Sequence, residues 1–292
     1  MTATVSTAQS HPALSPQADA AAWFGEVRKE LAAGRLAPYL GPGVTELAHA
    51  PVPSTQEALA AFFATKVALP RRARGDLGAA AQYVESRRHR SVVVQLMGEA
   101  FAAPVPPLPI HHLLAKLPVP LIVDTWYNGA MRAALAGRSD WGEIQGVRRS
   151  GLGGDQYYST YDASGNPCSL DAASGWKTVL YKPHGATVPA KNFLVSDSDY
   201  VEVLTEIDIQ TPIPEVVKVR RASLGFVFLG CRLNDQTLRA YARQLLKRTG
   251  GRHFIVVEPG LPTKNEQRFI RDHNLTVLVC PLSDALEQLA QP

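Results

Sequence analysis

Two glycines near the start of the chain end an apolar run, and their spacing is one that nucleotide-binding loops use. The run begins at Leu36 and breaks into Gly41, Pro42 and Gly43, with Thr45 two residues later. An apolar run bounded by glycines predicts a buried strand that ends in a tight turn. Backbone N–H groups at such a strand–turn–helix junction can bind a phosphate. A plain turn uses glycine equally often, so both a phosphate loop and an ordinary turn stay open at this point.

Polar residues follow three more apolar runs. Asp124 ends the run that begins at Pro120, His184 follows the run that begins at Thr178, and Glu258 follows a later one. A histidine just beyond a strand could act as a general base, although such a histidine is more often a structural hydrogen-bonding group. The sequence contains no recognisable nucleophile–base pair of the hydrolase type and no Walker lysine.

The elements around these residues predict the fold. Strands that are apolar from end to end alternate with amphipathic helices, which predicts an α/β fold with a Rossmann-like parallel sheet and helices on both faces. Ligands of such sheets bind at the carboxyl ends of the strands. We therefore expect the functional site where four loops meet at that edge, namely residues 41–45, 124–128, 230–235 and 258–260.

Two segments depart from this alternation. Residues 140–176 are rich in glycine, serine and aromatic residues, which predicts a hairpin-like insertion or flap. Residues 1–17 are rich in serine, threonine, alanine and proline and lack periodicity, so we expect a disordered tail. The remaining residues 18–292 are interpreted as one domain that contains the insertion.

Composition and charge limit which cellular compartment and which classes of partner we expect. The 292 residues carry a formal net charge of +4, an excess too small to predict a nucleic-acid partner. Basic clusters at residues 71–74 and 87–90 fit either solvated helix ends or an anion-attracting face. Cys168, Cys231 and Cys280 lie far apart, so neither a disulfide framework nor a zinc ribbon is expected. No apolar stretch reaches the ~18 residues of a membrane span. No secretory signal is recognisable, and we expect a cytoplasmic protein without a membrane partner.

Five short motifs, taken in order, resemble those of the sirtuin superfamily, in particular the zinc-free bacterial sirtuin-like domains that bind or hydrolyse NAD. They are Gly41-Pro-Gly-Val-Thr45, Asp124-Thr-Trp-Tyr-Asn128, Lys182-Pro-His-Gly185, Ser198-Asp-Tyr200 and Leu229-Gly-Cys-Arg-Leu-Asn-Asp235. The resemblance runs from about Leu36 to the C-terminus. The segments 82–90 and 194–200 also resemble a sirtuin-like subgroup found in nitrogen-fixation gene clusters.

The resemblance implies a nucleotide ligand, NAD or ADP-ribose, and no metal. The implied pyrophosphate loop contains Gly41, Pro42, Gly43 and Thr45, and the implied nicotinamide end contains Pro53, Asp124 and His184, where His184 would accept a proton from the nicotinamide ribose. The implied adenosine half is lined by Gly230, Cys231 and Arg232, with Glu258 accepting hydrogen bonds from ribose hydroxyls and Leu282 packing on adenine.

Two positions depart from the family pattern. Trp126 stands where the family has the asparagine that positions water or the ribose, and Asn128 stands where it has an aspartate. An indole offers one N–H donor and no acceptor, and it would fill part of the nicotinamide space. Losing such a positioning group costs several kcal/mol of transition-state stabilisation, a factor on the order of hundreds or more. A one-residue bulge that brings Asn128 into the asparagine's place is the alternative. The zinc module of protein deacylases is absent, so deacylation is not expected.

Three functions stay open. The first is an NAD- or ADP-ribose-binding protein with a degenerate catalytic centre that acts as a regulator or accessory factor. The second is an active NAD glycohydrolase that releases nicotinamide with His184 as general base and Asn128 as the stand-in amide. The third is a protein-interaction module with an occluded pocket. A protein partner or a second copy of the chain is compatible with all three.

Overall fold

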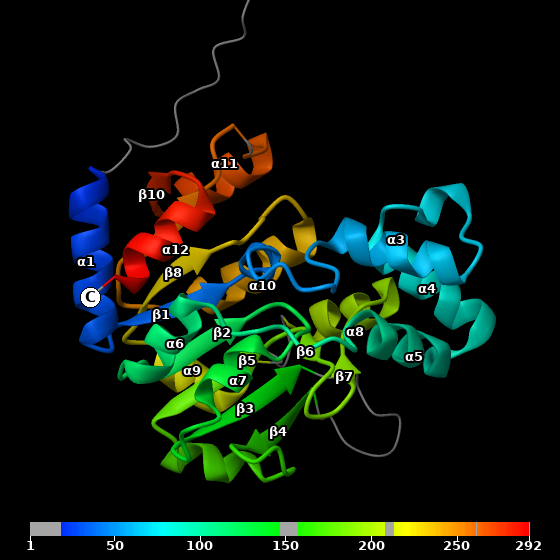
Figure 1. The fold of residues 1–292 in the computed structure, drawn as a ribbon, viewed down its shortest axis with the longest axis horizontal. Helices are drawn as coiled ribbons and strands as arrows, with labels where there is room; N and C mark the ends of the chain where they lie inside the picture. The colour runs from blue at the N-terminus through cyan, green and yellow to red at the C-terminus, as the bar shows by residue number, and fades with distance from the viewer. Residues whose placement is uncertain (1–18, 147–156, 208–212, 261, 292) are drawn as a thin grey trace, which may run out of the picture.

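The computed structural model describes residues 19–146, 157–207, 213–260 and 262–291. Within them, eight strands form one sheet in the order β10-β9-β8-β1-β2-β5-β3-β4 (Figure 1). The strands are β1 (Leu36–Leu40), β2 (Leu121–Asp124), β3 (Trp141–Gly146), β4 (Tyr158–Asp162), β5 (Thr178–Lys182), β8 (Gly225–Leu229), β9 (Phe254–Val257) and β10 (Thr276–Val279). All neighbours pair in parallel except β3 and β4. The predicted Rossmann-like parallel sheet is therefore confirmed.

Helices cover both faces of this sheet. One face packs on α1 (Ala20–Ala32), α6 (Pro109–Lys116), α7 (Ala130–Leu135) and α12 (Leu282–Ala290). The other packs on α9 (Glu215–Arg221), α10 (Gln236–Leu246) and α11 (Lys264–Asp272). Every residue of β1, β2, β5, β8 and β9 is buried. A strand covered on both faces needs apolar side chains at consecutive positions, which is why these strands read as apolar runs.

A separate helical core lies beyond the carboxyl end of β1. It is built by α3 (Gln56–Lys66), α4 (Leu77–Arg88) and α5 (Arg90–Ala100). The short helix η1 (Arg71–Ala73) contacts α4. Figure 1 shows these helices grouped to one side of the sheet, next to α8 (Asp197–Ile207). Trp126 and Tyr127, which follow β2, pack into this core together with Phe193. The loop after β2 therefore joins the sheet to the helical group.

The segment 140–176 contains the predicted hairpin-like pairing. Strands β3 and β4 pair antiparallel, and β3 also pairs in parallel with β5, so the pair extends the main sheet. The 3-10 helix η2 (Leu170–Gly175) follows, and Trp176 packs directly over Gly142, where no side chain fits. A two-stranded sheet of β6 (Gly185–Ala186) and β7 (Asn192–Phe193) lies after β5.

Two expectations from the sequence, the N-terminal tail and the domain assignment, stay predictions. The predicted tail over residues 1–17 lies outside the described residues, and the assignment of residues 18–292 to one domain stays a prediction. Among the residues that the structure describes, no helix has the length and apolar character needed to cross a bilayer.

Candidate functional site

The glycine junction after β1 packs backbone against backbone. The Gly41 N–H donates to the Leu229 carbonyl at 2.8 Å, and the Gly43 N–H donates to the Gly230 carbonyl at 2.9 Å. A Cβ atom on Gly43 would lie 3.0 Å from that carbonyl oxygen, and Gly41 leaves still less room. Gly230 has a φ of +65°, which favours glycine. Close approach of two loops thus requires these glycines, and the Gly43 amide already has an acceptor within the chain.

A cavity of about 630 Å³ opens beside this junction. In the strand order, β2 lies next to β1 on one side, and the later strands β8, β9 and β10 lie on the other side of β1. The direction of strand addition therefore reverses between β1 and β8, which makes this place a topological switch point. Open α/β sheets bind ligands at that place, and the volume is typical of small-molecule sites. Seven residues that the sequence predicted to bind a cofactor line the cavity: Pro42, Gly43, Gly230, Cys231, Arg232, Glu258 and Leu282.

The guanidinium of Arg232 lies at the wall of the cavity and is held there by Glu266. The Arg232 Nε donates to Glu266 Oε1 at 3.1 Å, and the Leu233 N–H donates to the same oxygen at 3.0 Å. Glu266 also lines the cavity and is buried, while the Arg232 side chain is 42% exposed. Burial raises the pKa of Glu266 and the Arg232 contact lowers it, with a net pKa below the ordinary value. An ionised Glu266 therefore holds the guanidinium where it can meet a ligand anion.

Sequence reasoning missed Glu266, although a signal was present. Thr263 and Glu266 form a capping box at the start of α11, in which the Glu266 N–H donates to the Thr263 hydroxyl and the Thr263 N–H donates to Glu266 Oε2 at 2.8 Å. The Thr-x-x-Glu spacing predicts such a box. It does not reveal that the same carboxylate reaches Arg232.

Glu258 and Cys231 are fixed by the backbone beside the cavity. Glu258 Oε1 accepts from the Leu282 N–H at 2.8 Å and so satisfies a backbone donor at the start of α12. The Cys231 thiol donates to the Tyr39 carbonyl at 3.3 Å. Burial raises the pKa of the Cys231 thiol far above its ordinary value, so it stays protonated and is a poor nucleophile.

His184 lies away from the cavity lining. It is 2% exposed, and its ring packs edge to face against Tyr200 and Tyr241. Its Nδ1 lies 3.4 Å from the Tyr200 hydroxyl oxygen. Burial lowers the pKa of His184 to about 4, so the imidazole is neutral near pH 7.

Trp126 and Asn128 are both engaged by the chain itself and lie outside the cavity lining. The Trp126 indole N–H donates to the Pro53 carbonyl at 2.9 Å, and its ring packs against those of Phe101 and Tyr127. The Asn128 amide N–H donates to the Thr45 hydroxyl at 2.6 Å, while Asn128 Oδ1 accepts from a backbone N–H of α7 at 2.9 Å. The amide of Asn128 therefore ties α2 (Pro42–Glu46) to α7.

Asp124 forms a buried ion pair that fixes the loop after β2. Lys182 Nζ lies 2.6 Å from Asp124 Oδ2 and donates to the Asn128 carbonyl at 3.1 Å. Asp124 Oδ1 accepts from the Trp126 N–H at 3.0 Å. The predicted residues Asp124, Trp126 and Asn128 are thus brought together, and Lys182 is the partner that the sequence did not identify.

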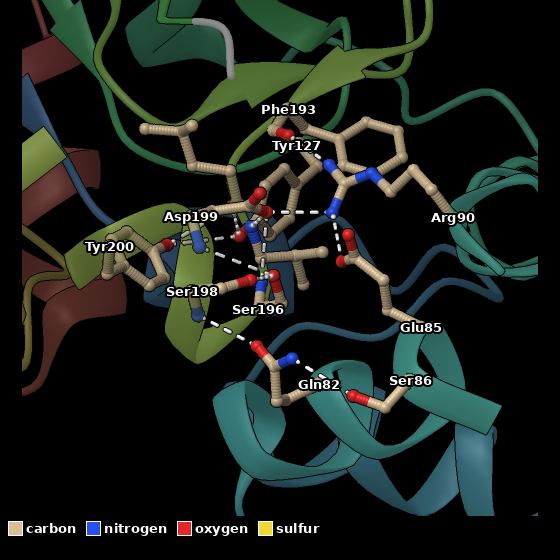
Figure 2. A network of polar contacts seen from close by, with 12 residues as sticks. Gln82, Glu85, Ser86, Arg90, Tyr127, Phe193, Ser196, Ser198, Asp199 and Tyr200 are labelled. Atoms are coloured by element: carbon tan, nitrogen blue, oxygen red, sulfur yellow. Dashed lines mark hydrogen bonds and ion pairs between the residues drawn. The ribbon is translucent and has the colours of Figure 1, made fainter. Parts of the chain in front are cut away.

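The two segments with the subgroup resemblance contact each other, as Figure 2 shows. Arg90 Nη1 lies 2.8 Å from Asp199 Oδ2 and 3.2 Å from Glu85 Oε2. Its Nη2 donates to the Phe193 carbonyl at 2.7 Å, and the Ser198 N–H donates to Gln82 Oε1 at 2.8 Å. Arg90 therefore joins α4 and α5 to the start of α8.

The SIR2-like domain matches residues 120–278, more than half of the chain. No curated protein matches the chain at a significant level. Among the described residues, no group of three histidine, cysteine, aspartate or glutamate side chains is arranged to hold a metal ion.

Proposed function

Because the chain belongs to the SIR2-like domain family, we propose that it binds a nucleotide of the NAD and ADP-ribose class in the cavity beside β1 and β8. The catalytic centre is degenerate, and the protein acts as a nucleotide-responsive regulator or accessory factor. The observation that carries this proposal is the cavity at the switch point, which is lined by seven of the residues expected to bind the cofactor.

The chemistry of the lining supports this ligand class. Arg232, held by Glu266, supplies positive charge for a pyrophosphate. Glu258 supplies carboxylate oxygens for ribose hydroxyls, and Leu282 with the side chains of β9 supplies an apolar wall for a base. The site therefore offers one group for each part of an adenosine diphosphate.

The state of the catalytic residues supports binding without turnover. Trp126 stands in place of the family's positioning asparagine, and its indole N–H donates to the Pro53 carbonyl. The Asn128 amide donates to the Thr45 hydroxyl and accepts from a backbone N–H at the start of α7, so it is not available to position water. His184 is buried behind its tyrosine neighbours.

The glycohydrolase alternative has one observation in its favour. His184 is neutral at pH 7 and so can accept a proton, but a pKa lowered to about 4 makes it a weak base. The engaged amide of Asn128 counts against it, because both ends of that amide are already hydrogen-bonded within the chain. The open cavity at the switch point favours both nucleotide hypotheses over an occluded interaction module.

A thermal-shift series with NAD, NADP and ADP-ribose tests the proposal. We expect NAD or ADP-ribose to raise the melting temperature of the wild-type chain. Gly43→Asp should remove the shift, because it places a carboxylate at the cavity beside Gly230. Gly137→Asp is the matched control, since a Cβ atom at that position meets no neighbouring heavy atom within 4 Å.

Arg232→Gln provides a second test that does not strain the glycine junction. It removes the guanidinium from the cavity wall, and we expect a smaller ligand shift, measured from the melting temperature of the free variant because the buried Glu266 loses its cation. A wild-type chain that responds to none of the three nucleotides would refute the proposal.

A further inference from the structure

The positive charge of the chain is concentrated in one part of the helical core. Residues 66–90 carry seven lysine and arginine side chains but only two carboxylates, an excess of five, whereas the whole chain has a net charge of +4. The rest of the chain therefore carries a small negative excess. The expectation against a nucleic-acid partner rested on the total charge, which conceals this local excess.

Most of these cations are not used inside the molecule. Lys66 pairs with Glu99, and Arg90 pairs with Asp199. The other five are exposed and form no ion pair with a described residue, namely Arg71, Arg72, Arg74, Arg87 and Arg88. Exposed guanidinium groups of one sign raise the local concentration of anions.

The five arginines form two clusters at the two ends of one helix. Arg71 and Arg72 belong to η1, which contacts α4, and Arg74 follows just before α4 begins. Arg87 and Arg88 are the last two residues of α4. Because α4 has 12 residues, the two clusters are about 18 Å apart. Figure 1 shows α4 and α5 at the edge of the molecule, where a large partner can reach them.

This spacing favours a partner whose anionic groups repeat along its length. About 18 Å of DNA duplex carries about ten phosphates. Arginine suits phosphate well, because its planar donors can bind two phosphate oxygens at once. Proteins that bind single strands offer aromatic side chains for the bases to stack on, whereas Phe62, Phe63 and Tyr83 of the helical core are at least partly buried.

Two other partners fit less well. Binding at a membrane surface requires exposed apolar side chains beside the basic ones. The exposed large apolar residues of the described chain, Val188, Val201 and Val219, lie outside α3, α4 and α5. Duplex RNA is recognised partly through its 2′-hydroxyls, whereas both clusters offer guanidinium groups that suit phosphate.

We propose that the two arginine clusters form a docking surface for duplex DNA, which they hold through its phosphates without reading the base sequence. The surface is separate from the nucleotide cavity, because none of the five arginines lines it. It therefore stands or falls independently of the proposed function.

Fluorescence anisotropy of the full chain with a labelled DNA duplex of about 20 base pairs tests this surface. We expect micromolar binding in low salt. A plot of log K against log salt should have a slope of about −4, because each neutralised phosphate contributes about −0.9. Arg71→Gln/Arg72→Gln and Arg87→Gln/Arg88→Gln should each make the slope shallower by about 2 and weaken binding about tenfold or more.

Arg243→Gln/Lys247→Gln is the matched control, because it removes the same two charges from exposed positions at the end of α10. It should leave the slope and the affinity near those of the wild type. Arg74 stays unchanged in all variants, because its Nε donates to the Leu69 carbonyl at 3.2 Å. Exposed substitutions of this kind barely change stability, so thermal melting near that of the wild type verifies that the variants fold.

The outcomes that would overturn the proposal are distinct. Absence of duplex binding, or a control variant that weakens binding as much as the cluster variants do, would show that the clusters form no docking surface. Tighter binding of a single strand or of an RNA duplex of equal length would assign the clusters to another nucleic acid. Displacement of the DNA by poly-glutamate at equal charge concentration would assign them to an acidic protein.

Discussion

Replacing Lys182 by methionine should destabilise the fold strongly. Lys182 Nζ lies 2.6 Å from Asp124 Oδ2, and the two side chains are 1% and 8% exposed. Methionine preserves the apolar stem but leaves the Asp124 carboxylate buried without its counter-charge. Removing one partner of a buried ion pair costs about 3–5 kcal/mol. The bond from Nζ to the Asn128 carbonyl is lost as well, so the loop that carries Trp126 is loosened.

Urea unfolding followed by circular dichroism measures this effect. Lys177→Met is the matched control, because Lys177 pairs with Asp140 at 3.2 Å but is 80% exposed. Exposed pairs contribute about 0–1 kcal/mol, so the control should unfold near the wild type. The double variant Asp124→Asn/Lys182→Met should cost less than the sum of its two single changes, because it leaves no unpaired charge. A Lys182→Met cost below about 1 kcal/mol, or strict additivity in the double variant, would refute the reasoning.

Three further predictions follow from other buried groups. Trp126→Phe keeps an aromatic ring but removes the indole donor, and urea unfolding should show a loss of about 1–2 kcal/mol; an unchanged midpoint would show that the bond contributes nothing. Glu266→Gln should weaken ADP-ribose binding by calorimetry about tenfold, because Arg232 loses its charged partner; equal affinity would mean that Arg232 does not meet the ligand. Burial lowers the pKa of both His111 and His184 to about 4, against about 6.5 when unfolded. Their contribution to stability is therefore complete above pH 6.5 and is lost as the pH falls toward 4, on the order of 3 kcal/mol for each group, which acid titration of the unfolding midpoint checks.

The sheet was predictable because its signal is local. Strands such as β1 and β8 are buried on both faces, so their composition alone marks them as core strands. The carboxyl edge follows from the parallel arrangement, and it places the loops after β1, β8 and β9 around one cavity. Predicting the core strands and the carboxyl edge of the sheet requires no knowledge of which side chains contact each other.

The partners of the polar side chains were not predictable, because they come from distant parts of the chain. Arg90 stands in a basic cluster that looks solvated in the sequence, yet it pairs with Asp199 of α8. Lys182 is the last residue of β5, where a lysine commonly reaches solvent, yet it is buried against Asp124. His184 lies between tyrosines of α8 and α10, and neither helix gives a pattern that points to it. Local periodicity determines which face is buried, but tertiary packing determines what each buried polar group meets.

The central claim, that the chain binds the nucleotide without cleaving it, is tested most directly by chromatography of NAD incubated with the protein. At NAD concentrations that saturate the thermal shift, the account predicts intact NAD and no nicotinamide above the protein-free control. Nicotinamide that accumulates with the wild type and disappears with His184→Ala would contradict it, and would identify an active glycohydrolase in its place.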